Sequence, residues 1–66
     1  MVQVVRITSP GGQRTLYVRE GGVLAYRALE RVRTCIVRRL PDHDGRCMVE
    51  MDGREERVPV ADLSEA

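Results

Sequence analysis

The sequence predicts an α+β fold in the order hairpin–helix–hairpin (ββαββ), with one helix on a face of a four-stranded antiparallel sheet. Three observations support this fold class. Segments rich in β-branched residues flank a Pro-Gly turn near the N-terminus, and alternating residues flank an Asp-Gly turn near the C-terminus. Between the two hairpins, apolar residues recur at helical spacing. A helix that covers both hairpins would bury these apolar stripes in one core.

Length and composition limit the size of this core. The 66 residues correspond to one small domain, residues 1–66. The chain contains no Phe or Trp and only two Tyr, so aliphatic side chains must fill the interior. A fold of this size buries only about 60% of the surface of its unfolded chain, so a partner subunit would add stability. The formal net charge of +1 excludes a chain that binds polyanions over its whole surface.

The first hairpin is expected from Val2 to Thr8 and from Arg14 to Arg19. Between these strands, Pro10 and Gly11 favour a type II turn, because Pro fixes the first central φ and Gly accepts the positive second one.

The pairing of these strands decides which residues share a face. If Thr8 pairs with Arg14, one face carries Val2, Val4, Leu16 and Val18, and the other carries Val5, Ile7, Thr15 and Tyr17. Since both faces are partly apolar, we interpret Val5, Ile7 and Tyr17 as a surface for a protein partner or a second copy. The alternative is ordinary partial exposure of Val and Tyr.

The central segment, Val23 to Leu40, is predicted to be an amphipathic helix. Its apolar face would consist of Leu24, Ala25, Ala28, Leu29, Val32, Cys35, Ile36 and Leu40. Pro41 would end the helix. Because Thr34 to Val37 is also β-prone, a helix that ends near Arg33 and is followed by a strand is the alternative.

The second hairpin is predicted around Asp52-Gly53, a dipeptide that suits a two-residue turn because both central residues need positive φ. Pairing Met51 with Arg54 places Cys47 opposite Val58. The tail after Val60 is expected to be a short turn with a frayed end. The predicted core therefore consists of Val2, Val4, Leu16, Val18, Leu24, Ala28, Leu29, Val32, Cys35, Ile36, Leu40, Cys47, Val49, Val58 and Val60.

The stretch GRCMVEMDGREERVPVADL, preceded by CIVRRLPDHD, resembles the last strands of SH3-like small barrels of the Tudor and KOW type. The resemblance covers about half of the chain. It implies a second possible fold, an SH3-like small β-barrel with a short helix, in which Thr34 to Leu40 is a strand and the helix shrinks to Leu24 to Arg33. This half of the chain contains no aromatic residue, so the aromatic cage of Tudor domains is not carried over.

No combination of residues predicts catalysis or a cofactor. Cys35, His43 and Cys47 have zinc-ligand chemistry, but structural zinc sites use four ligands, and both cysteines fall on apolar stripes. We therefore interpret them as core residues and a solvated loop histidine, with no metal. The candidate nucleophiles Ser9 and Ser64 lie far along the chain from His43, so no dyad is indicated and no enzyme activity or small-molecule substrate is expected.

Two functional hypotheses remain. The first is a non-enzymatic protein-interaction or assembly adaptor that uses its sheet surface, with a homodimer as one form. The alternative is a nucleic-acid-binding accessory protein in which Arg27, Arg31 and Arg38, on the outer side of the predicted helix, contact phosphates. With two cysteines, no N-terminal export signal and no membrane span, the expected location is the cytoplasm.

Overall fold

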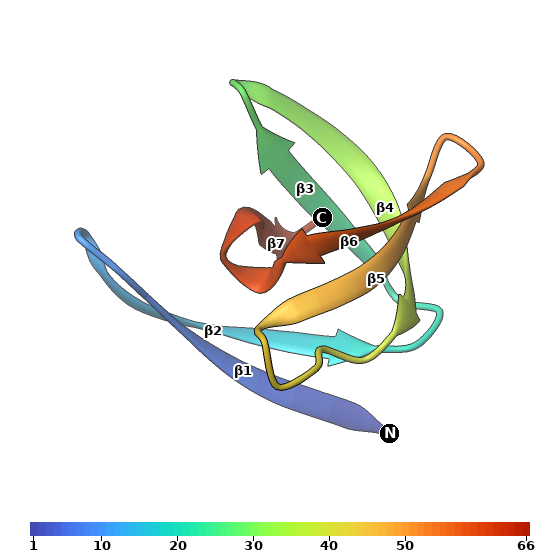
Figure 1. Ribbon diagram of the computed structural model, residues 1–66. Coiled ribbons are helices and arrows are strands. Elements are labelled where there is room, and N and C mark those ends of the chain that lie inside the picture. The colour runs from blue at the N-terminus through green and yellow to red at the C-terminus, as the bar shows by residue number, and fades with distance from the viewer.

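A computed structural model describes all residues, 1–66, and shows a fold built from β-strands without an α-helix (Figure 1). The only helical element is one 3-10 turn near the C-terminus. The elements in chain order are β1 (Val2–Ser9), β2 (Gly12–Arg19), β3 (Val23–Ala28), β4 (Arg31–Arg39), β5 (Arg46–Met51), β6 (Arg54–Pro59), η1 (Val60–Asp62) and β7 (Leu63–Glu65). The predicted α+β fold class is therefore wrong.

The segment predicted to be a helix forms the β3–β4 hairpin instead. Its apolar residues also satisfy an alternating pattern, which buries Leu24, Cys35 and Val37 on one side of the sheet. The chain reverses at Leu29 and Glu30, whose φ values of 50° and 64° are both positive. Neither residue is typical of such a turn, so the sequence did not indicate the reversal. The shorter helix from residue 24 to 33 is likewise absent.

The strands form two antiparallel sheets. The larger sheet has five strands in the order β6-β5-β4-β3-β7, and the smaller one is the β1–β2 hairpin. β2 continues through residues 20–22 into β3 and lies against β4 and β7, whereas β1 is the outer strand of the hairpin (Figure 1). The side chain of Arg14 donates a hydrogen bond to the carbonyl of Ala61 at 2.9 Å and so ties the hairpin to η1.

The register of the first hairpin differs from the prediction by one residue. Thr8 pairs with Gln13 rather than with Arg14, because only Pro10 and Gly11 lie between the last paired residues. A slip of one residue exchanges the two faces of a strand. Val5 and Ile7 consequently lie on the inner face of the hairpin, on the same side as the buried Leu16 and Val18.

The second hairpin confirms its predicted register, with Met51 paired to Arg54 and Cys47 paired to Val58. Asp52 and Gly53 have φ values of 52° and 79°, as a turn with two positive φ angles requires. The C-terminal tail is not frayed. Leu63 pairs with Tyr26 through β7 and is fully buried.

One hydrophobic core joins the two sheets, and it consists of Ile7, Leu16, Val18, Leu24, Cys35, Val37, Cys47, Val49, Met51, Val58 and Leu63. Seven of these were predicted. The prediction missed the other four, Ile7, Val37, Met51 and Leu63, and wrongly included the exposed Val2, Val4, Leu29 and Val32. The remaining predicted core residues, Ala28, Ile36, Leu40 and Val60, are partly buried.

Candidate interaction surface

The outer side of the N-terminal hairpin carries an apolar cluster among polar and charged residues. Val2, Val4 and Tyr17 lie on the side of the hairpin opposite Leu16 and Val18, and their exposed fractions are 53%, 56% and 59%. Val23, at the start of β3, is 52% exposed and lines the same surface pocket as Val2 and Tyr17. We call these four residues the outer face. Large apolar residues gathered on one exposed surface are typical of sites where a monomer contacts a partner.

The outer face contains a surface pocket of about 330 Å³. Its lining residues are Val2, Tyr17, Arg19, Gly22, Val23, Leu24 and Val37. Arg19 is the only charged residue among them. At Gly22 an added Cβ would lie 3.0 Å from the carbonyl oxygen of Arg19, so a larger residue would require a small shift of the backbone. The pocket is at the small end of the range for ligand sites, about 300–1,000 Å³. Five of its seven lining residues are hydrophobic.

The edge of β1 is the second feature of this surface. β1 pairs only with β2, and none of the backbone hydrogen bonds outside the regular strand pairing involves a β1 residue. Hydrogen-bonded and non-bonded pairs alternate along an antiparallel ladder, so every second residue of β1 has backbone N–H and C=O groups that point away from β2. Arg6 is the only charged residue in this eight-residue strand, which also lacks proline. β1 therefore has an open edge.

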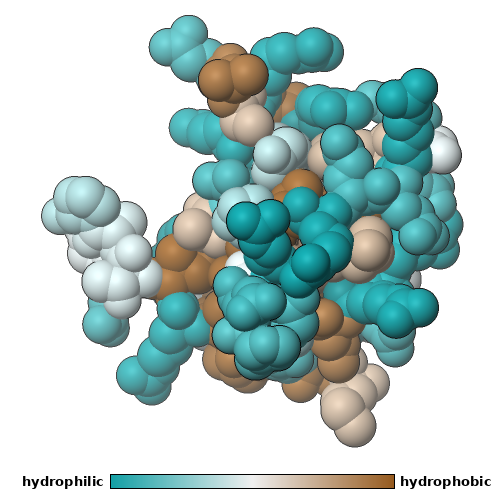
Figure 2. Space-filling view, viewed as in Figure 1, coloured by the Kyte–Doolittle hydropathy of each residue, from teal (hydrophilic) through white to brown (hydrophobic).

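The edges of the larger sheet differ from that of β1. β6 contains four charged residues among six and ends in Pro59, and β7 has only three residues. Charges, proline and short length are the features that keep edge strands from pairing with other chains. Figure 2 shows hydrophobic residues over the lower part of the molecule, where β1 lies, and mainly hydrophilic residues over β6.

The three residues predicted to contact a partner do not share one surface. Ile7 is only 5% exposed and belongs to the core, and Val5 packs against the core. Tyr17 alone is exposed, on the face opposite to Val5 and Ile7. The sequence analysis missed Val2, Val4 and Val23 as surface residues. A two-residue turn at Pro10-Gly11 was the signal that would have placed Val2 and Val4 on the outer face with Tyr17.

The three arginines predicted to contact nucleic acid do not form one stripe. Arg27 pairs with Val32, and Arg31 pairs with Ala28, so Arg27 and Arg31 lie on opposite faces of the β3–β4 hairpin. Arg38 binds Glu50, with 3.0 Å between its Nε and the Oε1 of Glu50. The regular spacing of these arginines depended on a helix that is absent.

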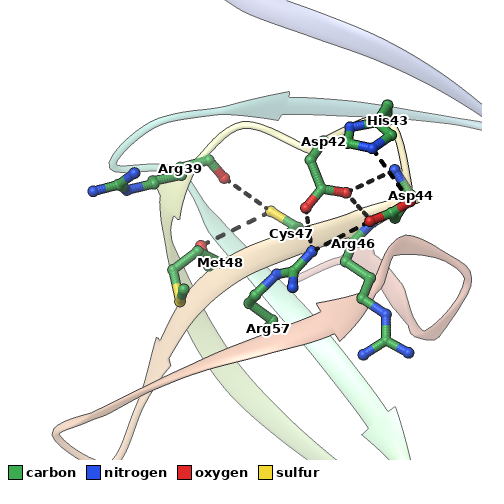
Figure 3. A network of polar contacts seen from close by, with 8 residues as sticks. All are labelled: Arg39, Asp42, His43, Asp44, Arg46, Cys47, Met48 and Arg57. Carbon is green, nitrogen blue, oxygen red and sulfur yellow. Dashed lines mark hydrogen bonds and ion pairs between the residues drawn. The ribbon is translucent and has the colours of Figure 1, made fainter.

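The loop between β4 and β5 contains the main polar network (Figure 3). One carboxylate oxygen of Asp42 accepts hydrogen bonds from the backbone N–H groups of Asp44 and Arg46, at 2.9 and 3.1 Å. The other oxygen accepts from the guanidinium of Arg57. The hydrogen bond from the Arg46 backbone, followed by that from Arg57, lowers the pKa of Asp42. These contacts close the loop on itself and tie it to β6, so Asp42 has a structural role.

His43 does not join the two cysteines, which belong to the same core. Both cysteines are buried and free, whereas His43 is exposed in the loop. The thiol of Cys47 donates to the carbonyl of Arg39 at 3.1 Å. Burial raises the pKa of Cys35, and it raises the pKa of Cys47 to about 11. Both thiols are therefore protonated at neutral pH, and the thiolate form that binds metals or attacks substrates is suppressed.

The structure contains no helix with the length and apolar character that crossing a bilayer requires. Comparison of the chain with models of protein families, with characterised proteins and with solved structures finds no match. The resemblance of the C-terminal half to Tudor and KOW barrels consequently stays a prediction.

Proposed function

We propose that this protein is a non-enzymatic protein-interaction module that binds a partner on its outer face. The observation that carries this proposal is the pocket between Val2, Tyr17 and Val23, each of which is more than half exposed. Fully burying one such side chain contributes about 1.5–3 kcal/mol. A partner that covers these residues would gain from their burial without any rearrangement of the core.

The chemistry of the pocket defines the kind of segment that would bind. Two of its lining residues, Leu24 and Val37, belong to the core and are 5% and 1% exposed. An aliphatic or aromatic side chain of the partner would contact them between Val23 and Tyr17. The guanidinium of Arg19 would then donate to an acceptor at the edge of the contact. This proposal includes the cytoplasmic location, where the free cysteines of the core would stay reduced.

The test uses the intact protein as bait to capture partners from a cell extract. The native chain is compared with the variants Val23→Ser and Tyr17→Ser. Val32→Ser is the matched control, because Val32 has a similar exposed fraction of 58% but lies outside the pocket. We expect one specific protein to be retained at high salt by the native chain and by the control. Both outer-face variants should lose it.

The opposite pattern would contradict the proposal. Contacts to phosphates weaken steeply as salt rises, whereas apolar contacts do not. If nucleic acid is captured at low salt only, and if Arg27→Ala with Arg31→Ala abolishes the capture while Val23→Ser does not, the arginines and not the outer face carry the function.

A further inference from the structure

The open edge of β1 leaves backbone groups free to pair with another strand. We propose that β1 pairs in antiparallel orientation with β1 of a second copy, which joins the two hairpins into one four-stranded sheet. The inference rests on the proposed function, because it adds a second copy to a protein-interaction module, but it concerns the edge of the hairpin and not its pocket.

The sequence of β1 is compatible with pairing to itself. In the antiparallel register centred on Val5, Val4 lies opposite Arg6 of the second copy, and Val2 lies opposite Thr8. Every position from 2 to 8 then has a partner, and no like charges are directly opposed. The register centred on Arg6 would place two guanidinium groups face to face, which destabilises a strand pair. A two-fold axis through Val5 is the symmetry of the commonest type of oligomer.

Charge favours β1 over the other edges. A symmetric pairing of β6 centred on any of its four charged residues would place that residue opposite the same residue of the second copy, and like charges repel. Pro59 cannot donate a hydrogen bond to the ladder. β7 is too short to contribute more than a few hydrogen bonds. β2, the other strand of the two-stranded sheet, carries Arg14 and Arg19 and lies against β4 and β7. β1, with one charge in eight residues, therefore opposes strand addition least.

The accessible surface also indicates a partner subunit. The chain exposes 4913 Å², whereas a compact folded chain of 7.5 kDa is expected to expose about 4250 Å². The difference of about 660 Å² is close to the roughly 800 Å² that each partner buries in a standard interface. The residues on the hairpin that contribute to this exposed surface include Val2 and Val4 of β1 itself. A second copy along β1 would cover part of their side chains.

The pairing makes the two outer faces neighbours. A two-fold axis perpendicular to the joined sheet places the outer faces of both copies on the same side of it. Val4 of one copy is then diagonal to Val4 of the other, and Arg6 of each copy lies opposite Val4 of its neighbour. The dimer would therefore offer a partner two outer faces on one side of the joined sheet.

Sedimentation equilibrium of the intact chain tests this inference, with the substitutions Val4→Lys and Val4→Glu. We expect the native chain to have a mass twice its 7.5 kDa at low and at high salt. Val4→Lys would oppose Arg6 of the second copy with a like charge and should sediment as a single chain. Val4→Glu would oppose the same arginine with an opposite charge and should remain a dimer.

Two controls separate this inference from the proposed function. Val32→Lys replaces a valine of similar exposure on the β3–β4 hairpin and should remain a dimer. Tyr17→Ser, which impairs the pocket, should also remain a dimer. Circular dichroism establishes that Val4→Lys is folded.

The outcomes are decisive in either direction. A native chain that sediments as 7.5 kDa at millimolar concentration overturns the dimer, as does a Val4→Lys variant that is folded and dimeric. A Val4→Glu variant that is monomeric overturns the register. If the native chain is monomeric yet captures its partner through Val23 and Tyr17, the proposed function stands without the dimer. If it is dimeric but captures nothing through those residues, the proposed function fails alone.

Discussion

β1 and β6 are both outer strands of hairpins in the same small molecule, yet their edges have opposite chemistry. β6 carries Arg54, Glu55, Glu56 and Arg57 and ends in proline, whereas β1 carries one arginine in eight residues. Natural sheets blunt their edges with charges and proline because an open edge pairs with other chains. Protection against edge pairing is therefore local in this protein. The chain has a blunted edge on its larger sheet and an open one on its hairpin.

The inner face of the N-terminal hairpin packs into the core, as the buried side of β5 does. Leu16 is fully buried on the inner face of the hairpin, as Val49 is on β5. We expect Leu16→Ala to lower the free energy of unfolding by about 3 kcal/mol, the largest effect predicted, because it removes apolar contacts and leaves a cavity. Urea unfolding measures this loss. Tyr17→Ala, on the outer face, should change it by less than about 0.5 kcal/mol. Equal losses would mean that the hairpin has no distinct inner and outer faces.

The buried side of β5 carries a titratable group, Cys47, whereas the buried residues of the N-terminal hairpin carry none. The folded state holds the pKa of Cys47 at about 11, above the value of 9.0 for an unperturbed thiol. The unfolded chain therefore loses protons first as pH rises, and stability falls between about pH 9 and 11. We expect a loss of about 1–2 kcal/mol after allowance for screening. Urea midpoints at pH 8 and 10.5 measure it. In the variant Cys47→Val this part of the pH dependence should disappear.

A change in the β3–β4 turn should affect the stability of the chain but not its association. Leu29 and Glu30 both adopt positive φ, which costs a non-glycine residue about 1–2 kcal/mol. Replacement by Asn-Gly, the preferred pair for such turns, should raise the free energy of unfolding by about 1–2 kcal/mol. Thermal unfolding measures the gain. The mass in solution should not change, since the turn belongs to neither edge. A loss of stability would show that these φ values are not strained.

Opening the β6 edge should give the smallest change in stability. We expect Glu55→Val with Glu56→Val, both at exposed positions and in no ion pair, to alter the free energy of unfolding by no more than about 0.5 kcal/mol. The chain should associate beyond the dimer, because each chain would then have two open edges. Masses above that of a dimer, which increase with concentration in sedimentation, are the expected result. An unchanged mass would show that charge on β6 does not protect its edge.

The two hairpin turns of the larger sheet explain what the sequence could predict. Asp52-Gly53 has residues that tolerate positive φ, and the turn and its register were predicted correctly. Leu29-Glu30 forms the same kind of turn without such residues, and apolar spacing that fits both a helix and two strands led to the wrong element. Tertiary contacts decide between the two patterns, because only the strands bury Val37 beside Cys35.

The register of the first hairpin, which was predicted with an error of one residue, decides which side chains lie on the candidate surface. Predicting Thr8 opposite Arg14 assigned Val5 and Ile7 to the surface, where the structure has Val2 and Val4. Tyr17 was the one correctly exposed residue. Exposure of the β1 edge could not be read from the sequence, because which strand is outermost depends on how the two sheets are joined. Leu63 was missed for the same reason, since its burial requires pairing with the distant Tyr26.

Amide hydrogen exchange, measured residue by residue at increasing protein concentration, tests the contrast between the two edges most directly. An open β1 edge that pairs with a second copy predicts that alternate β1 amides exchange quickly in dilute solution and become protected as concentration rises. The amides of β6 should exchange at rates that do not depend on concentration. Concentration-dependent protection of β6, or β1 amides that stay unprotected at millimolar concentration, would contradict the account.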